Sequence, residues 1–240
     1  MADLCLPRCC TVCGRPLMME EDVICLPCLA DLPVTGFARM SHNPMADALN
    51  ERIGRMYPDE GGIPYCYAAA LLYYSNESPY RQIPRKLKYG RDFREGAYFA
   101  RMLGRELASS RQFADVDTVV PVPLHRKRKR ERGYNQAELI AAEVAAALPF
   151  ATLDKTLLER TRFTSTQTAL ETEAKEANVR GAFKCRRSRT GTVPRHILIV
   201  DDVFTSGATS GECFRALYDK YGGGTRLSVA TLSFVHNDNA

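Results

Sequence analysis

The residues best suited to chemistry lie between His196 and Thr209, where an apolar run leads into acids and then into hydroxyls. Two carboxylates, Asp201 and Asp202, follow the branched apolar run 197–200. Next comes a loop of small residues, which consists of Thr205, Ser206, Gly207, Ala208 and Thr209. A loop of this kind before a helix points several backbone N–H groups at one spot, where the helix dipole favours negative charge. We therefore expect the loop to cradle a phosphate monoester.

The acids beside this loop indicate what the phosphate is attached to. Ionised carboxylates only accept hydrogen bonds, so Asp201 and Asp202 suit the hydroxyl groups of a sugar. Phosphate donors beside hydroxyl acceptors describe a ribose 5-phosphate site. The plainer alternative is a strand end with a solvated acidic turn and a helix N-cap. The crowding of carboxylates, hydroxyls and a glycine into the segment 201–209 disfavours that alternative.

A second cluster of reactive side chains lies at the N-terminus. Six of the nine cysteines fall within the first 28 residues, among them the pairs Cys10-x-x-Cys13 and Cys25-x-x-Cys28. Paired cysteines at this spacing place four thiolates within tetrahedral reach of one Zn²⁺, and a closed site of this type is structural. Cys9 can replace Cys10 as a ligand, and Cys5 is a weaker competitor. Chance clustering of reduced thiols is the alternative.

A third feature is a basic run after the predicted strand 117–124. Six of the seven residues from Arg126 to Arg132 are basic. Such a run repels itself, so we expect a mobile loop when no anion is bound. It can bind pyrophosphate or nucleic-acid phosphates, and the alternative is a solvated charge run. The candidates for stabilising a departing pyrophosphate are Arg126, Lys127, Arg128 and Arg132, with Arg85 and Lys88 as outsiders.

Hydrophobic patterning predicts the elements that must position these residues. The run 197–200 is typical of a strand buried on both faces of a parallel sheet. The strand over 117–124 must end near Pro121, because proline cannot donate into a sheet ladder. The polar segment 160–168 is a plausible lid. Further helices are expected over 44–56, 79–88, 93–108, 138–148, 170–177 and 210–221, and further strands over 65–74 and 226–235.

Composition bounds the architecture. The chain has 240 residues, of which 45% are hydrophobic, so it can build a core. It has no apolar run long enough for a membrane span and no secretory signal, so we expect a cytoplasmic protein. We predict an α/β protein with a mainly parallel sheet flanked by helices. The predicted units are a zinc-knuckle module over 1–33, a connector over 34–64 and the α/β domain over 65–240.

The segment 197–209 resembles the signature of type I phosphoribosyltransferases, which bind phosphoribosyl pyrophosphate (PRPP). In those enzymes an apolar strand leads into two acids and a Thr/Ser/Gly loop. The resemblance implies that Asp201 and Asp202 hold the ribose 2′- and 3′-hydroxyls and that the loop holds the 5′-phosphate. It also implies a type I phosphoribosyltransferase-like fold for 65–240, with Mg²⁺ bound together with PRPP.

Motifs spread over nearly the whole chain resemble the ComF/GntX family of competence and DNA-utilisation proteins. Besides the paired cysteines and the PRPP signature, the matching pieces are Lys86–Gly90, Val120–Leu124, Glu131–Gln136, Arg160–Arg162, Thr164 with Gln167, and Asn178–Phe183. Two positions depart from the pattern: Thr166 stands where proline is expected, and Lys175 where arginine is usual.

The family resemblance implies a role in DNA uptake or natural transformation together with PRPP binding. Two functions follow as hypotheses. One is a phosphoribosyltransferase that releases pyrophosphate from PRPP, in which Asp201, Asp202 and the basic run act in catalysis. The other is a non-catalytic module that keeps the phosphate site and binds single-stranded DNA. The implied partners are PRPP or another ribose 5-phosphate, single-stranded DNA and a DNA-uptake helicase.

Overall fold

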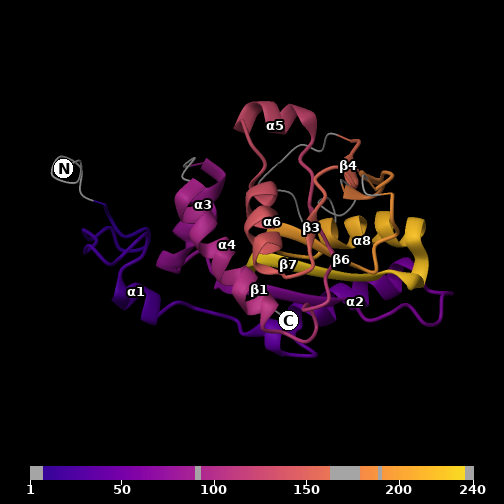
Figure 1. The fold of residues 1–240 in the computed structure, drawn as a ribbon, viewed down its shortest axis with the longest axis horizontal. Helices are drawn as coiled ribbons and strands as arrows, with labels where there is room; N and C mark the ends of the chain where they lie inside the picture. The colour runs from indigo at the N-terminus through magenta and orange to yellow at the C-terminus, as the bar shows by residue number, and fades with distance from the viewer. Residues whose placement is uncertain (1–7, 90–92, 163–178, 189–190, 236–240) are drawn as a thin grey trace.

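The computed structural model describes residues 8–89, 93–162, 179–188 and 191–235. An α/β body carries the N-terminal cysteine-bearing module at one end (Figure 1). The α-helices are α1 (Leu26–Ala30), α2 (Pro44–Met56), α3 (Gln82–Tyr89), α4 (Phe93–Ala108), α5 (Arg126–Arg132), α6 (Gln136–Ala147) and α8 (Ala208–Tyr221). The short 3₁₀ helices are η2 (Phe37–Arg39), η3 (Pro79–Arg81) and η4 (Gly222–Gly224). The strands are β1 (Tyr67–Tyr74), β2 (Thr118–Pro121), β3 (Thr152–Leu153), β4 (Leu158–Arg160), β5 (Phe183–Cys185), β6 (His196–Phe204) and β7 (Arg226–Val235).

The core of the body is a sheet of five parallel strands in the order β1-β7-β6-β2-β3. β6 lies at its centre, and its residues Ile197 to Val200 are fully buried, as the run of branched residues predicts. A separate antiparallel pair is formed by β4 and β5. The predicted α/β class with a mainly parallel sheet is confirmed.

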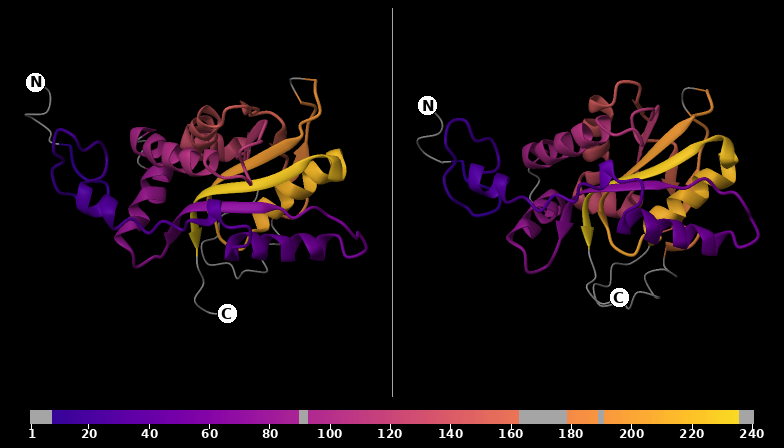
Figure 2. Two further views of the ribbon diagram at one scale, coloured as in Figure 1. Left: turned by 60° about the horizontal axis from the view of Figure 1, so that its bottom comes forward. Right: turned by 90° about the horizontal axis from the view of Figure 1, so that it is seen from below.

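Helices cover both faces of the sheet. α4 and α6 pack on each other, and α6 contacts β2 and β6. On the other face α2 and α8 pack on each other, with α2 against β1 and α8 against β6. The left view of Figure 2 shows the two layers on opposite sides of the sheet. The strands β1, β7, β6 and β2 are therefore largely screened from water on both faces, which is the usual condition for a parallel sheet, whereas the edge strand β3 is partly exposed.

β6 is longer than the sequence analysis expected, and both acids belong to it. On one side β6 pairs with β7 as far as Phe204, opposite Phe234. On the other side its pairing with β2 stops at Val200, opposite Pro121, followed by one hydrogen bond from the Val122 N–H to the Val200 carbonyl (2.8 Å). Pro121 ends β2, as predicted. The acids that follow Val200 thus lie where β6 no longer pairs with β2.

The prediction of a mobile loop over 126–132 is wrong, because these residues form the helix α5. Arginine, lysine and glutamate are good helix formers, and this propensity outweighs their mutual repulsion here. The His125 side chain caps the helix by accepting from the Lys127 N–H (3.3 Å). Gly133, at φ +82°, ends it and donates its N–H to the Lys129 carbonyl (2.9 Å).

Most other expected elements are present. The helices predicted over 44–56 and 93–108 and the strand over 226–235 have the predicted bounds, and α8 begins two residues earlier than expected. The lid expected over 160–168 lies largely outside the described residues, and the helix expected over 170–177 lies wholly outside them. In the described part of the chain, no helix has the length and apolar character that crossing a bilayer requires.

A buried histidine stabilises the end of the sheet opposite the acids. At the start of β6, the His196 ring nitrogens lie 2.8 Å from Asp115 Oδ1 and 2.8 Å from Ser228 Oγ. This order matches that of a serine-protease triad, but His196 is 1% exposed and Ser228 is fully buried, so no substrate reaches them. Burial lowers the pKa of His196, and the charge of Arg226 also lowers it, whereas the hydrogen bond to the Asp115 carboxylate raises it.

Because the folded state disfavours protonated His196, acid should weaken the fold. Its neutral form contributes stability that is complete above the unfolded pKa of about 6.5 and is lost as the pH falls through the lower folded pKa. We expect the unfolding free energy to decrease from pH 7 to pH 5 by urea titration. The variant His196→Gln should lose part of this slope, and His42→Gln, which changes an exposed histidine, should keep it. Equal slopes in both variants would contradict this assignment.

Candidate functional site

The loop that follows the acids is held by a buried aromatic ring. Gly207 has φ +73°, and a Cβ there would lie 2.8 Å from Cζ of Phe204. Phe204 is 2% exposed and packs against the Phe234 ring, with centroids 5.9 Å apart. Only glycine satisfies both the backbone angle and the contact. The loop therefore turns directly from the end of β6 into α8, whose first-turn bond runs from the Gly211 N–H to the Gly207 carbonyl (2.8 Å).

The loop hydroxyls are within reach of a ligand. Thr205 is exposed, Ser206 and Thr209 are half-buried, and the backbone of Gly207 and Ala208 is packed beneath them. The loop is thus not covered by packing, and it leads into the N-terminus of the 14-residue helix α8. The structure places the five predicted loop residues directly after β6 and the two acids inside the C-terminal part of that strand, not after it as the sequence analysis expected.

Arg160, at the end of β4, is a residue of this region that the sequence analysis did not select. Burial lowers the pKa of its guanidinium, and the charge of Arg128 on α5 lowers it further, whereas the charge of Asp201 raises it. Its Cζ lies 5.2 Å from the centre of the Phe183 ring. A half-buried cation therefore lies within electrostatic range of both Asp201 and Arg128. No spacing signal assigns this place to Arg160, because its nearness to Asp201 arises only in the tertiary fold.

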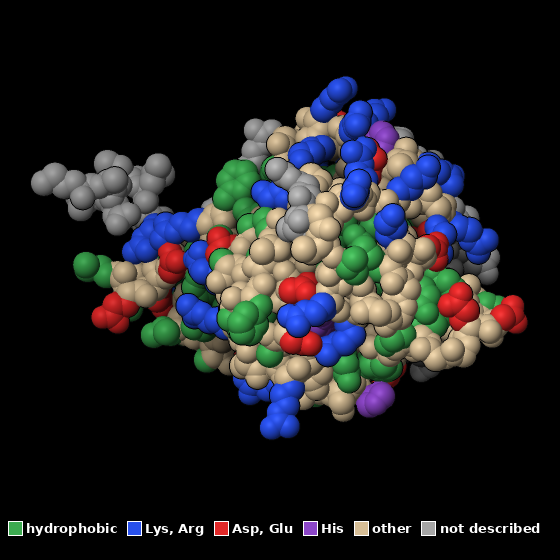
Figure 3. Space-filling view, turned by 45° about the vertical axis from the view of Figure 1, so that its right-hand side comes forward, with side chains coloured by type: hydrophobic (Ala, Val, Ile, Leu, Met, Phe, Trp, Pro, Cys, Tyr) green, Lys and Arg blue, Asp and Glu red, His purple; other side chains and the backbone are tan. Residues whose placement is uncertain are grey.

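The basic helix α5 follows β2 and projects from the body of the molecule (Figure 1). Its Lys and Arg side chains gather at the top of the space-filling view (Figure 3). Arg126 and Lys127 are exposed, Arg128 and Arg132 are half-buried, and Arg132 donates to Gln136 Oε1 (3.2 Å). Arg128 is thus the predicted cation whose charge acts on Arg160.

The two weaker cation candidates, Arg85 and Lys88, belong to α3 and not to α5. Arg85 is an exposed residue of α3, and nothing is described of the Lys88 side chain. Lys86 of the same helix forms an ion pair with Glu95 (3.0 Å), which also accepts from the Thr11 hydroxyl (2.5 Å). α3 therefore contacts the cysteine-bearing module through Glu95.

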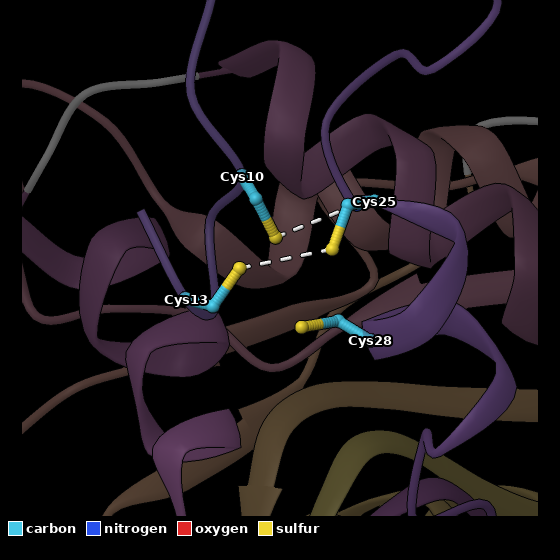
Figure 4. Close-up of side chains that lie close together, drawn as sticks. All are labelled: Cys10, Cys13, Cys25 and Cys28. Atoms are coloured by element: carbon cyan, nitrogen blue, oxygen red, sulfur yellow. Dashed lines mark hydrogen bonds between the residues drawn. The ribbon is translucent and has the colours of Figure 1, made fainter. Parts of the chain in front are cut away.

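The four predicted metal ligands form one cluster. The Sγ atoms of Cys10, Cys13, Cys25 and Cys28 all lie within 4.8 Å of one another, and they point toward a common centre (Figure 4). Cys13 Sγ and Cys25 Sγ are 3.7 Å apart. Zinc–sulfur bonds of about 2.3 Å in a tetrahedron place sulfurs about 3.8 Å apart. The four thiols therefore fit a tetrahedral metal such as zinc. Cys9 is not a member of this cluster, and Cys5 lies outside the described residues.

A buried carboxylate organises the cysteine module. Glu21 is 5% exposed and accepts from the Leu26 N–H (2.8 Å), the Met18 N–H (2.9 Å) and the Arg15 guanidinium (2.5 Å). Burial raises the pKa of the Cys25 thiol, but the Cys28 N–H and Arg15 outweigh it and lower this pKa to about 6. The module therefore favours a thiolate at Cys25, which is the form that binds metal.

Similar proteins of known name include competence protein F and the DNA utilization protein YhgH. No protein-family model matches the sequence. Competence protein F of Haemophilus influenzae is 31% identical over 113 residues, which is 47% of this chain and 49% of that protein. The DNA utilization protein YhgH of Escherichia coli K12 is 28% identical over 211 residues, or 87% of this chain and 83% of YhgH. YhgH of Salmonella typhi is 32% identical over 142 residues, or 58% and 61%. The match thus spans about half the length of competence protein F.

The close contact between Gly207 and the Phe204 ring can be tested by a substitution that adds one methyl group at position 207. Gly207→Ala should cost at least about 1 kcal/mol of stability, because alanine is strained at this backbone angle and its Cβ meets the ring. Thermal unfolding measures the loss. Gly61→Ala is the matched control, since a Cβ there has no atom within 4 Å and needs no special φ. Equal melting temperatures for the two variants would show that the loop does not pack as described.

The cysteine cluster predicts a defined metal content. The purified protein should hold one zinc per chain by elemental analysis, and a strong chelator should lower its melting temperature. Cys25→Ser should abolish binding, because Cys25 belongs to the cluster. Cys9→Ser should keep the metal, since Cys9 lies outside it. Loss of zinc in Cys9→Ser with retention in Cys25→Ser would reverse the ligand assignment.

Proposed function

We propose that this chain, a homologue of competence protein F and of the DNA utilization protein YhgH and hence a relative in the ComF family, is a PRPP-binding protein that acts in DNA uptake or use. The observation that carries the proposal is that two acids and a hydroxyl-bearing loop lie together at the C-terminal end of β6. The relatives' names support the DNA role, and the site supports the sugar phosphate.

In this proposal each part of the site has one task. The backbone and hydroxyls of Thr205 to Thr209 bind the 5-phosphate, with the positive end of the α8 dipole behind them. Asp201 and Asp202 accept from the ribose hydroxyls. Mg²⁺ bound with PRPP supplies charge neutralisation of the pyrophosphate. Arg128 and Arg160 lie close enough for their charges to interact, and a bound pyrophosphate would relieve that repulsion.

Phosphoribosyl transfer is the catalytic extension of the proposal. An acceptor attacks C1′ of PRPP, the bond from C1′ to the pyrophosphate oxygen breaks, and the bonding electron pair leaves with the pyrophosphate. The cations of α5 stabilise that departing charge, with Arg126, Lys127, Arg128 and Arg132 as the candidates. The cysteine module has a structural task in this proposal, because four thiolates leave no open position on a zinc ion.

A second candidate function is binding of single-stranded DNA without transfer. The observation that favours it is the exposed charge of α5, together with the words "DNA utilization" in the name of the YhgH relatives. Nucleic-acid binding through such charges depends steeply on salt. The two activities would share the cations of α5, whereas the acids of β6 serve the sugar phosphate alone.

PRPP titration by calorimetry tests the proposal. The wild-type protein should bind PRPP in the presence of Mg²⁺, and Asp201→Asn with Asp202→Asn should weaken binding at least tenfold, about 1.4 kcal/mol. Asp59→Asn with Glu77→Gln removes the same charge from exposed positions and should leave the affinity unchanged. Pyrophosphate release in the presence of candidate bases and nucleotides measures transfer. Unaltered PRPP binding by the Asp201/Asp202 variant would exclude this site.

A further inference from the structure

A strongly positive cavity lies on the face of the body that α2 and α8 cover. Its volume is about 630 Å³. It is lined by the end of α2, the first half of α8 and the turn before β5, which contribute Arg52, Arg55, Met56, Arg180, Gly181, Ala208, Glu212 and Arg215. Four of these described lining residues are arginines and one is an acid. A cavity with this lining attracts anions.

The single lining carboxylate is already committed to the protein. Glu212 is 6% exposed, and its Oε2 accepts from the Gly181 N–H (2.6 Å) and from Arg215 Nη2 (2.9 Å). These bonds fix the turn at Gly181 against α8 and hold Arg215 at the wall of the cavity. Within the described residues, Arg180 forms no ion pair. The charge of Glu212 therefore offsets Arg215, and the exposed Glu51 forms an ion pair with Arg55 on the same helix.

The geometry of the cavity is held in place from the α2 side as well. Arg52 Nε donates to the Ser206 carbonyl (3.1 Å). Its stem lies over the first turn of α8, where a Cβ at Gly211 would be 2.8 Å from Arg52 Cδ. A guanidinium fixed in this way is a preorganised donor, and its planar fork suits the oxygens of phosphate.

The positive lining continues along α8. A second cavity of about 390 Å³ shares Gly181 and Arg215 with the first and adds Lys184 and Lys220. Its acid, Asp219, is bonded to the Tyr57 hydroxyl (2.5 Å) and to Arg215 (3.5 Å). α8 has 14 residues and is therefore about 21 Å long. The two cavities form a cationic path, here named the arginine groove, that is too long for a single phosphate.

We propose that the arginine groove binds the phosphodiester backbone of single-stranded nucleic acid. The proposal rests on the DNA role given under the proposed function and assigns that role to a place other than α5. The groove is also distinct from the sugar-phosphate site, since Ala208 is the one loop residue in its lining and neither acid belongs to it. Arg52 connects the two sites through its bond to Ser206.

Fluorescence anisotropy of a labelled single-stranded oligonucleotide at several salt concentrations tests this assignment on the 240-residue chain with zinc bound. Arg55→Gln with Arg180→Gln should weaken binding about tenfold at low salt. The log–log salt slope should become shallower by about 1.4, because each lost phosphate contact contributes about 0.7. Arg105→Gln with Arg111→Gln removes the same charge from other exposed positions and should leave affinity and slope unchanged.

Further results of these measurements would overturn the arginine groove or distinguish its failure from a failure of the proposed PRPP site. Equal losses in the groove variant and its control would overturn it, as would a loss confined to an Arg126→Gln/Arg130→Gln variant of α5. Complete competition by a mononucleotide at low concentration would assign the groove to free nucleotides instead. The groove variant should retain wild-type PRPP affinity. A failure of PRPP binding in the wild-type protein would therefore leave the salt-slope result for the groove unaffected.

Discussion

The site depends on the unequal pairing of β6. Its neighbour β7 accompanies it to Phe204, whereas β2 stops at Pro121, which has no N–H to continue the ladder. The strand is thus held by one neighbour at the point where Asp201 and Asp202 occur. A fully paired strand would bury both backbone edges, and a free loop would not orient the acids. Pairing on one side leaves one backbone edge open and still orients the acids. The C-terminal ends of parallel strands are also where open α/β sheets bind ligands.

The helix α8 contributes to two surfaces of different chemistry, the sugar-phosphate loop at its N-terminus and the arginine groove along its outer face. Its N-terminus, entered through Gly207, offers backbone donors beside the acids. Its outer face, bonded to the Gly181 turn through Glu212, presents Arg215 to a cavity whose other arginines come from α2 and from that turn. The bond from Arg52 to the Ser206 carbonyl joins the two surfaces.

The sequence predicts the parts of this structure that local rules determine. Branched runs mark the buried strands, Pro121 marks the end of β2, and the cysteine spacing marks a cluster that the fold closes. Charge repulsion predicts a loop over 126–132, but helix propensity and the caps at His125 and Gly133 outweigh it and form α5. The proximity of Arg160 to Asp201 and the arginine groove depend on long-range packing of β4, α2 and α8, for which no local pattern exists.

The central claim is that the end of β6 and the loop after it grip a phosphorylated pentose. A crystal structure of the protein with ribose 5-phosphate tests it most directly. The account predicts the phosphate within hydrogen-bond distance of the backbone N–H groups and hydroxyls of Thr205 to Thr209, with the ribose hydroxyls at Asp201 and Asp202. Density for the sugar phosphate in the arginine groove or on α5, with the loop vacant, would contradict it.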